Sequence, residues 1–262
     1  MRRYLRIYRL FWRNSFRREA EFRANFWAKV VTNVAWLAFF VLTVEVIYSQ
    51  TSAVAGWSRA EGLMLSGICY FVTSVASLTF YPNLSQIPNL VQQGTMDFVF
   101  TRPIRSVFWV SFRFVNLDEI GSLLGALALI LYSWRNLPRQ PGVEEIAGFL
   151  ALVIAALVML YALYLFMMST AFWLVRVDNL VVLIDTMLYT ARFPTDVFQG
   201  LARRLFTWVI PVAFIATAPA SVLAGKAGLE LVGWGVMLSV LFLLLAMRFW
   251  AFASRHYSSA SS

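Results

Sequence analysis

Long apolar runs separated by short polar segments dominate the chain of 262 residues. A helix needs about 20 apolar residues to cross a bilayer, and five runs reach that length: 27–48, 62–81, 114–134, 146–174 and 229–252. A sixth run begins near position 179 and is short, because Arg192 and Pro194 interrupt it. The runs are continuous rather than alternating, which favours helices over barrel strands. The pattern therefore predicts an all-α integral membrane protein with six transmembrane helices.

Basic residues in the loops predict how these helices are oriented. With both termini on the cytoplasmic side, 15 of the 22 basic residues lie in cytoplasmic segments and seven lie outside. The segment before the first run contributes most to this difference. We therefore expect a multi-pass protein of the bacterial inner membrane with both termini in the cytoplasm.

The first 26 residues differ from the rest of the chain, because basic and aromatic positions recur there at helical spacing. The apolar stripe consists of Tyr4, Ile7, Tyr8, Phe11 and Trp12. Five arginines form a second stripe on residues 2–18. This pattern predicts an amphipathic helix in the membrane interface, with its aromatic rings in lipid and its arginines toward anionic headgroups. Its main expected role is to anchor the topology, and it can also contact a cytoplasmic partner.

Composition excludes several classes of protein. Hydrophobic residues make up 60% of the chain and charged residues 13%, whereas soluble domains are about 25% charged. A disordered chain or a soluble enzyme is therefore excluded, and a nucleic-acid-binding domain would be less apolar despite the net charge of +9. The chain has one cysteine, Cys69, and one histidine, His256, so no internal disulfide or histidine-rich metal site is expected.

Catalytic motifs are also absent from the sequence. Gly225 and Lys226 are followed by alanine, so they do not form a phosphate-binding loop. The zinc-protease and serine-hydrolase motifs do not occur. We therefore predict that the chain is not an enzyme, has no cofactor of its own, and depends on another chain for any ATP hydrolysis.

The segment 83–105 between the second and third runs is predicted to form short helices outside the membrane. Ser85 is expected to cap a helix that ends at Gly94. Asp97 lies near the positive end of a second turn, which Pro103 stops. The exposed positions would be two aromatic rings and two arginines: Phe98, Phe100, Arg102 and Arg105. Such an element fits a groove on another protein, although an ordinary loop between spans is the simpler interpretation.

The segment 192–227 is apolar but interrupted by Pro194, Pro211 and Pro219. Asp196 can cap a helix there, and two short re-entrant helices on the outer side fit better than one straight span. Broken backbone at membrane depth is tolerated only beside protein or water, so this segment is expected to border a cavity or an exit. The alternative is a poorly hydrophobic span that places the C-terminus outside.

Ionisable residues also lie in or beside the runs, where they are costly and usually face the protein interior or water. Asp118, Glu119 and Asp185 are the candidates, and Asp185 is the most deeply placed. A structural role for Asp185, as partner of an arginine or as a helix cap, is favoured over contact with substrate or protons. Gly121 and Gly125 allow close packing of helices.

Two groups of motifs resemble the type-2 ABC transporter permeases. Leu90-Val-Gln-Gln-Gly-Thr-Met-Asp-Phe followed by Thr101-Arg-Pro-Ile is similar to that family's coupling-helix region. Three proline-containing motifs resemble its hairpin before the last span: Phe193-Pro-Thr-Asp-Val-Phe, Ile210-Pro-Val-Ala-Phe and Ala218-Pro-Ala-Ser-Val-Leu-Ala-Gly. The resemblance covers essentially the whole chain and is closest to permeases of about 260 residues without a fused ATPase.

This resemblance implies a permease subunit that pairs with a second copy or a related permease and binds two cytoplasmic ABC ATPase subunits, which bind ATP and Mg. The docking residues would be Gln86, Val91, Gly94, Asp97, Phe98, Phe100, Arg102 and Pro103. The outer gate would include Pro194, Asp196, Pro211, Phe214 and Pro219. The direction of transport, taken as export, follows from family analogy alone. Two other functions stay open: a proton-coupled secondary transporter that uses Asp185, and a membrane scaffold that transports nothing.

Overall fold

The computed structural model describes residues 2–21, 23–174, 178–201, 206 and 212–257. Within these residues, five helical segments are long and apolar enough to cross a membrane: Arg23–Gln50, Arg59–Thr79, Leu117–Arg135, Val143–Phe172 and Glu230–Arg255. They correspond to the five long apolar runs and extend several of them by a few residues. The described part of the chain is all-α apart from one hairpin of two two-residue strands.

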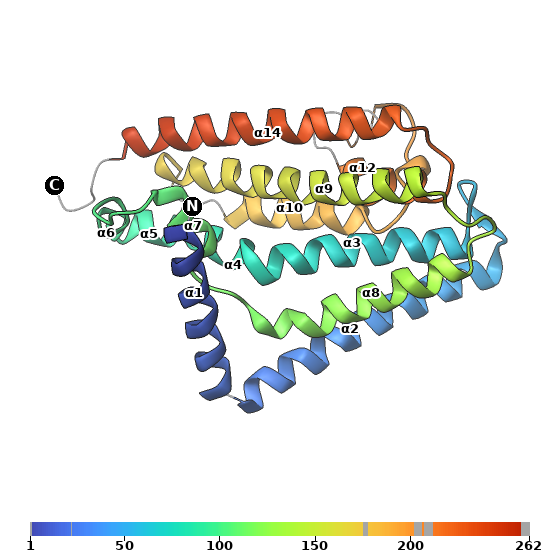
Figure 1. The fold of residues 1–262 in the computed structure, drawn as a ribbon, viewed down its shortest axis with the longest axis horizontal. Coiled ribbons are helices and arrows are strands. Elements are labelled where there is room, and N and C mark those ends of the chain that lie inside the picture. Colours follow the sequence, from blue (N-terminus) through green and yellow to red (C-terminus); the bar gives the residue numbers. More distant parts are fainter. Residues whose placement is uncertain (1, 22, 175–177, 202–205, 207–211, 258–262) are drawn as a thin grey trace.

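The long helices lie side by side as a bundle (Figure 1). Their bounds are α2 Arg23–Gln50, α3 Arg59–Thr79, α8 Ile120–Arg135, α9 Val143–Ser169 and α14 Glu230–Arg255. The short helix η1, Leu117–Glu119, leads into α8, and η2, Thr170–Phe172, follows α9. Helix α3 is central and α2 lies at the edge of the bundle. In the most apolar 18-residue stretch of each helix, 72% of the residues of α3 are buried, against 11% of those of α2.

Short elements cover both ends of the bundle. At the end where the chain begins lie α4 Tyr81–Leu84, α5 Ile87–Gln92, α6 Asp97–Phe100 and α7 Ser106–Phe112 (Figure 1). At the opposite end lie β1 Ala53–Val54, β2 Trp57–Ser58, η3 Thr195–Val197, α12 Val212–Ile215 and α13 Thr217–Leu223. The strands β1 and β2 are antiparallel, with Ala53 opposite Ser58 and Val54 opposite Trp57. The amphipathic helix α1, Arg2–Glu21, runs across the first end, and α14 ends at that same end.

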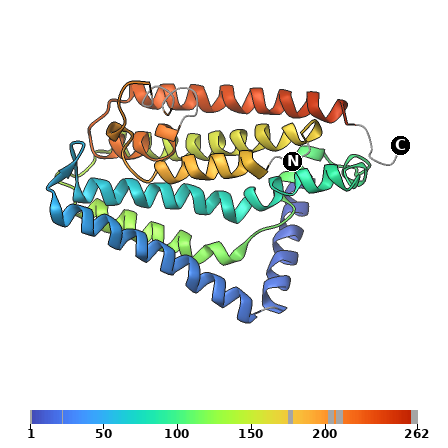
Figure 2. The ribbon, with the colours of Figure 1, turned by 180° about the vertical axis from the view of Figure 1, so that it is seen from behind.

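The sixth apolar run forms a shorter helix, α10, Asp178–Thr190. Its 13 residues extend about 20 Å, less than the roughly 30 Å of a bilayer core. Both views place α10 beside α3 and α9 (Figure 2). Of the predicted gate residues, Pro211 lies outside the described residues. Phe214 lies on α12 and Pro219 on α13, and both helices are fully buried against α9 and other elements of the bundle.

The predicted close packing at Gly121 and Gly125 is present between α8 and α2. A Cβ atom on Gly121 would lie 2.9 Å from Val30 Cγ1, and one on Gly125 would lie 2.5 Å from Leu37 Cδ2. Real side chains do not tolerate such contacts without movement, so the two helices can approach this closely because both positions are glycine.

Gly125→Leu is therefore expected to separate α2 from α8 and to lower stability by about 1–3 kcal/mol, the usual cost of overpacking. The measurement is thermal unfolding of the purified chain in detergent. Gly233→Leu on α14 is the matched control, because nothing lies within 4 Å of a Cβ atom there. Equal midpoints for the two variants would contradict the assigned role of Gly125.

Candidate functional site

The segment 83–105 forms a folded cap on one end of the bundle. Its interior is made by Leu84, Ile87, Met96 and Val99, which are at most 1% exposed. Gly94 ends the turn after α5 with a φ of +66°, a left-handed conformation that favours glycine. These buried residues make the cap a defined surface rather than a mobile connection.

The predicted helix start at Ser85 is wrong, because α5 begins at Ile87 with Gln86 at its N-cap. Two prolines explain the difference. Pro82 and Pro88 each occupy the first turn of a helix, where the missing N–H costs nothing. The first proline starts α4, so Ser85 becomes the C-cap of that turn.

Most of the predicted docking residues lie on the outer surface of this cap. Phe98 is 67% exposed and Phe100 is 36% exposed. The other exposed positions are Gln86, Asp97, Arg102 and Pro103. Val91 and Gly94 are half-buried and support the surface from below. The surface thus presents an aromatic ring among polar and charged groups.

Asn83 ties this cap to the transmembrane helices and was not found by the sequence analysis. Its buried amide nitrogen donates to Thr79 O and to Phe114 O, both at 2.7 Å, and its Oδ1 accepts from Phe114 N at 2.7 Å. The side chain therefore joins the end of α3 to the backbone that leads into α8. No sequence motif indicates such a long-range contact.

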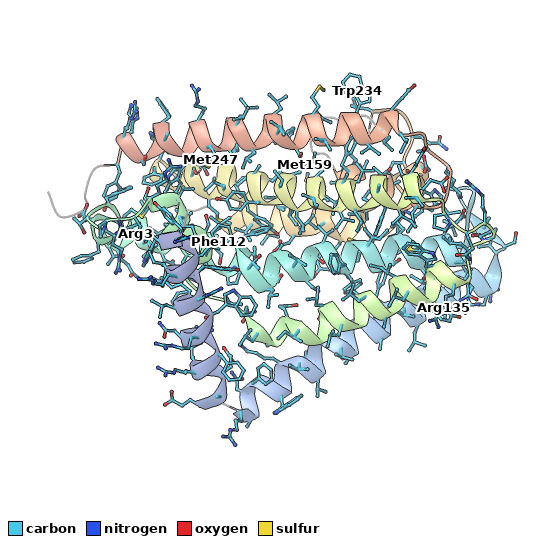
Figure 3. The ribbon with its side chains drawn as sticks, viewed as in Figure 1. Arg3, Phe112, Arg135, Met159, Trp234 and Met247 are labelled. Carbon is cyan, nitrogen blue, oxygen red and sulfur yellow. The ribbon has the colours of Figure 1, made fainter. Side chains whose placement is uncertain are left out.

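Helix α7 connects the cap to α9. The hydroxyl groups of Ser111 and Tyr161 are 2.9 Å apart, and the rings of Phe112 and Tyr161 stack with centroids 6.0 Å apart. Figure 3 labels Arg3 and Phe112 at this end of the bundle and Arg135 at the other end. A displacement of the cap would therefore act directly on α3 and α9.

Helix α1 also contacts the cap through its aromatic stripe. The rings of Tyr4 and Phe108 pack edge-on with their centroids 4.9 Å apart, and those of Tyr8 and Phe112 pack edge-on with their centroids 6.2 Å apart. Arg3 Nη2 donates to Pro103 O at 2.8 Å. The aromatic stripe is thus half-buried against the rings of α7, and its contact with lipid stays a prediction.

A polar cavity of about 390 Å³ lies among α2, α3, α9 and α10. Its charged lining consists of Glu119, Asp185 and Arg192, and several tyrosines and small hydroxyl residues complete it. Tyr164 donates to Asp185 Oδ1 at 2.9 Å, and Tyr81 lies 3.5 Å from Oδ2. Asp185 was expected to pair with an arginine or to cap a helix, and tyrosines stabilise it instead.

The two other ionisable side chains of this region have different surroundings. Arg192 lies over the rings of Tyr70 and Tyr189, with its guanidinium carbon 4.6 and 4.3 Å from their centroids. Asp118 is buried outside the cavity and pairs with Lys29 at 3.1 Å. Glu119 and Asp185 therefore face one shared space, whereas Asp118 holds η1 against α2.

At the opposite end of the bundle, the loop between α2 and α3 is bonded to the segment 192–227. Trp57 Nε1 donates to Asp196 Oδ2 at 3.0 Å, and Lys226 Nζ is 2.8 Å from Glu61 Oε2. Asp196 lies inside η3 rather than at a helix cap. We call these two contacts the outer latch, because the orientation predicted from the basic residues would place this end outside. Glu61 also forms the capping box at the start of α3 with Ser58, three residues earlier. The sequence analysis missed this box, although its spacing is a local sequence signal.

The predicted gate residues surround this latch. Asp196 and Phe214 line a cavity of about 610 Å³ at this end. Pro194 and Pro219 are buried beside them, and Phe214 packs against α14, where a Cβ on Gly235 would lie 3.1 Å from its ring. The structure thus brings the described gate residues together around one space.

A bundle of membrane-length helices with a polar cavity inside, a folded cap at one end and bonded segments at the other defines a multi-pass membrane protein with the layout of a transport permease. The family model described as ABC-2 family transporter protein matches residues 34–261. The chain therefore belongs to the ABC-2 family and is a transmembrane permease of an ABC transporter, a family that generally works with ABC ATPase partners. Searches of curated proteins and of solved structures each returned no match.

Proposed function

We propose that this chain is the permease subunit of an ATP-driven exporter whose ATPase subunits dock on the segment 83–105. The chain would cross the bacterial inner membrane six times, with both termini cytoplasmic. Helix α10 would supply the fifth crossing, and the segment 192–227, of which residues 202–205 and 207–211 lie outside the described residues, would form a re-entrant hairpin in the outer leaflet. Two permease copies, or this chain and a related one, would bind two ATPase subunits.

The single observation that carries this proposal is the exposure of Phe98. Its ring is 67% exposed on a folded cap at an end of the bundle, where the neighbouring exposed groups are Asp97 and Arg102. Exposed apolar surface rimmed by polar residues is typical of interaction sites, and aromatic anchors surrounded by polar residues are typical of binding hot spots. In a permease of this family, the expected partner is the ATPase.

Force on the docking surface can reach the membrane through the contacts of Asn83 and Ser111. Asn83 connects the cap to α3 and to the start of α8, and Ser111 connects it to Tyr161 on α9. These helices line the polar cavity. ATP would shift the complex between two states because its affinity for them differs, and ATP with Mg would bind to the partner subunits.

The polar cavity is the proposed path for substrate in this alternating-access cycle. Glu119, Asp185 and Arg192 would contact a polar group of the cargo, and opening of the outer latch would release it. Because both carboxylates face one space, proton-coupled transport without ATP is the second candidate. Transport in vesicles with a proton gradient and no nucleotide would favour that alternative.

The proposal is tested by capture of the ATPase from native membranes. The tagged full-length chain, extracted in mild detergent, is expected to retain a protein that carries a phosphate-binding loop, as identified by mass spectrometry. Phe98→Ala should reduce capture about tenfold or more, because aromatic anchors dominate interface energies. Phe39→Ala is the matched control, since Phe39 is 63% exposed on the membrane helix α2. Capture of no ATPase, or equal capture by both variants, would refute the proposal.

A further inference from the structure

A second polar cavity, of about 450 Å³, lies where α1 and α2 meet the docking cap. Three cations line it from three separate segments: Arg18 of α1, Lys29 of α2 and Arg113 just after α7. Side-chain amides of Asn25, Asn116 and Gln86 complete the polar lining, and Glu19 is its single carboxylate among the described residues. This excess of positive charge is not used by the transport proposal.

The three cations differ in how well their charge is neutralised. Arg18 bonds to the adjacent Glu19 at 2.9 Å, and Lys29 pairs with Asp118 at 3.1 Å. Among the described residues, Arg113 has no carboxylate partner. Its guanidinium is held instead between the rings of Trp109 and Phe114, 4.2 and 4.0 Å from their centroids.

Arg113 is therefore a charged group that is fixed in place before any ligand arrives. Burial, and secondly the charge of Arg102, lowers the pKa of Arg113 from its ordinary value. Both loss of water and a neighbouring like charge disfavour the charged form of a cation. Arginine still stays protonated at neutral pH. An anion between Arg113, Arg18 and Lys29 would relieve this unfavourable environment.

The position of the cavity indicates the chemistry of that anion. Helix α1 runs across the ends of the membrane helices (Figure 1), and Lys29 lies in the second turn of α2, the first membrane span. The cavity is thus at the depth of lipid headgroups. Basic pockets between helices at this depth bind anionic headgroups, and guanidinium groups match phosphate oxygens in geometry.

We propose that this cavity binds the phosphate of an anionic glycerophospholipid between α1, α2 and the docking cap. The bound phosphate would bridge Arg18 and Lys29 to Arg113, and so connect the interface helix to the cap. The backbone N–H and C=O of Phe114, beside Arg113, are both hydrogen-bonded to the side-chain amide of Asn83, so lipid binding would stabilise the anchor of the docking surface. This inference does not depend on the identity of the ATPase or of the cargo.

The test measures lipid binding by the purified, delipidated full-length chain in detergent, by native mass spectrometry and by the thermal midpoint. Dioleoylphosphatidylglycerol is expected to bind more tightly than dioleoylphosphatidylcholine. Arg113→Gln and Arg18→Gln should each weaken binding of the anionic lipid roughly fivefold or more, the effect of one basic residue near a charged headgroup. Arg248→Gln, which removes an exposed arginine on α14 outside the cavity, should change it less than twofold.

A further arm separates a lipid from a free phosphate group. Inorganic phosphate at millimolar concentration is expected to leave the midpoint unchanged; if it stabilises the chain as much as the anionic lipid does and Arg113→Gln removes both effects, the lipid assignment is overturned. Equal binding of the two lipids would also overturn it. If Arg113→Gln fails to fold, Arg18→Gln decides alone, and unchanged binding by that variant would refute the proposal.

Discussion

Asn83→Leu is expected to lower the free energy of unfolding by about 3 kcal/mol, because three backbone groups lose their partner and a buried unsatisfied group costs roughly 1–3 kcal/mol. Those groups are Thr79 O, Phe114 O and Phe114 N, and Asn83 is only 4% exposed. Leucine has a similar size, so the loss would come from hydrogen bonding rather than from a cavity. Thermal and denaturant unfolding in detergent measure it.

The matched control for this prediction is Asn89→Leu, which changes an exposed amide in the same segment. Its effect on stability should be small, as for most surface substitutions. Asn83→Leu should also disconnect the cap from α3. If the proposed docking holds, the folded variant would still capture the ATPase but would transport less. If Asn83→Leu unfolds at the same midpoint as Asn89→Leu, the anchoring role of Asn83 is wrong.

Lys226→Met is expected to have the second large effect, about 2 kcal/mol of destabilisation, because it leaves a buried carboxylate with one partner fewer. Glu61 is 7% exposed and would retain only its bonds to Ser58, at 2.7 and 2.8 Å. A double-mutant cycle with Glu61→Gln measures the coupling directly. The double variant should lose less stability than the two single losses combined.

The control for the outer latch is Arg59→Met, which breaks the exposed pair of Arg59 with Glu45 at 2.7 Å. Solvent screens such pairs, so the change in stability should be much smaller than for Lys226→Met. Both variants remove one basic residue from the same end of the bundle, which isolates burial as the variable. Equal destabilisation would show that the latch contributes no more than a surface ion pair.

The sequence predicts the long helices well, because a membrane requires about 20 apolar residues in a row and leaves few alternatives. The five long runs, the amphipathic α1 and the exposure of Phe98 were all readable from local pattern. The start of α5 was wrong because two prolines compete with Ser85 for the role of helix initiator.

Contacts between distant segments could not be predicted. Glu119 and Asp185, which are 66 positions apart, line one cavity. Trp57 and Asp196, which are 139 positions apart, are joined by a hydrogen bond. Local pattern contains no information on such pairs, since it fixes which residues share a helix face but not which helices are neighbours. The same reason explains why Asn83 and Arg113 were not recognised as functional candidates.

The way α1 grips the docking cap has a consequence for engineered chimaeras between permeases. A transplanted 83–105 segment would carry its aromatic surface but would leave behind Tyr4 and Arg3, which bond to it from α1. To exchange the proposed ATPase specificity between two such permeases, the first 21 residues should therefore be moved together with the cap as one module.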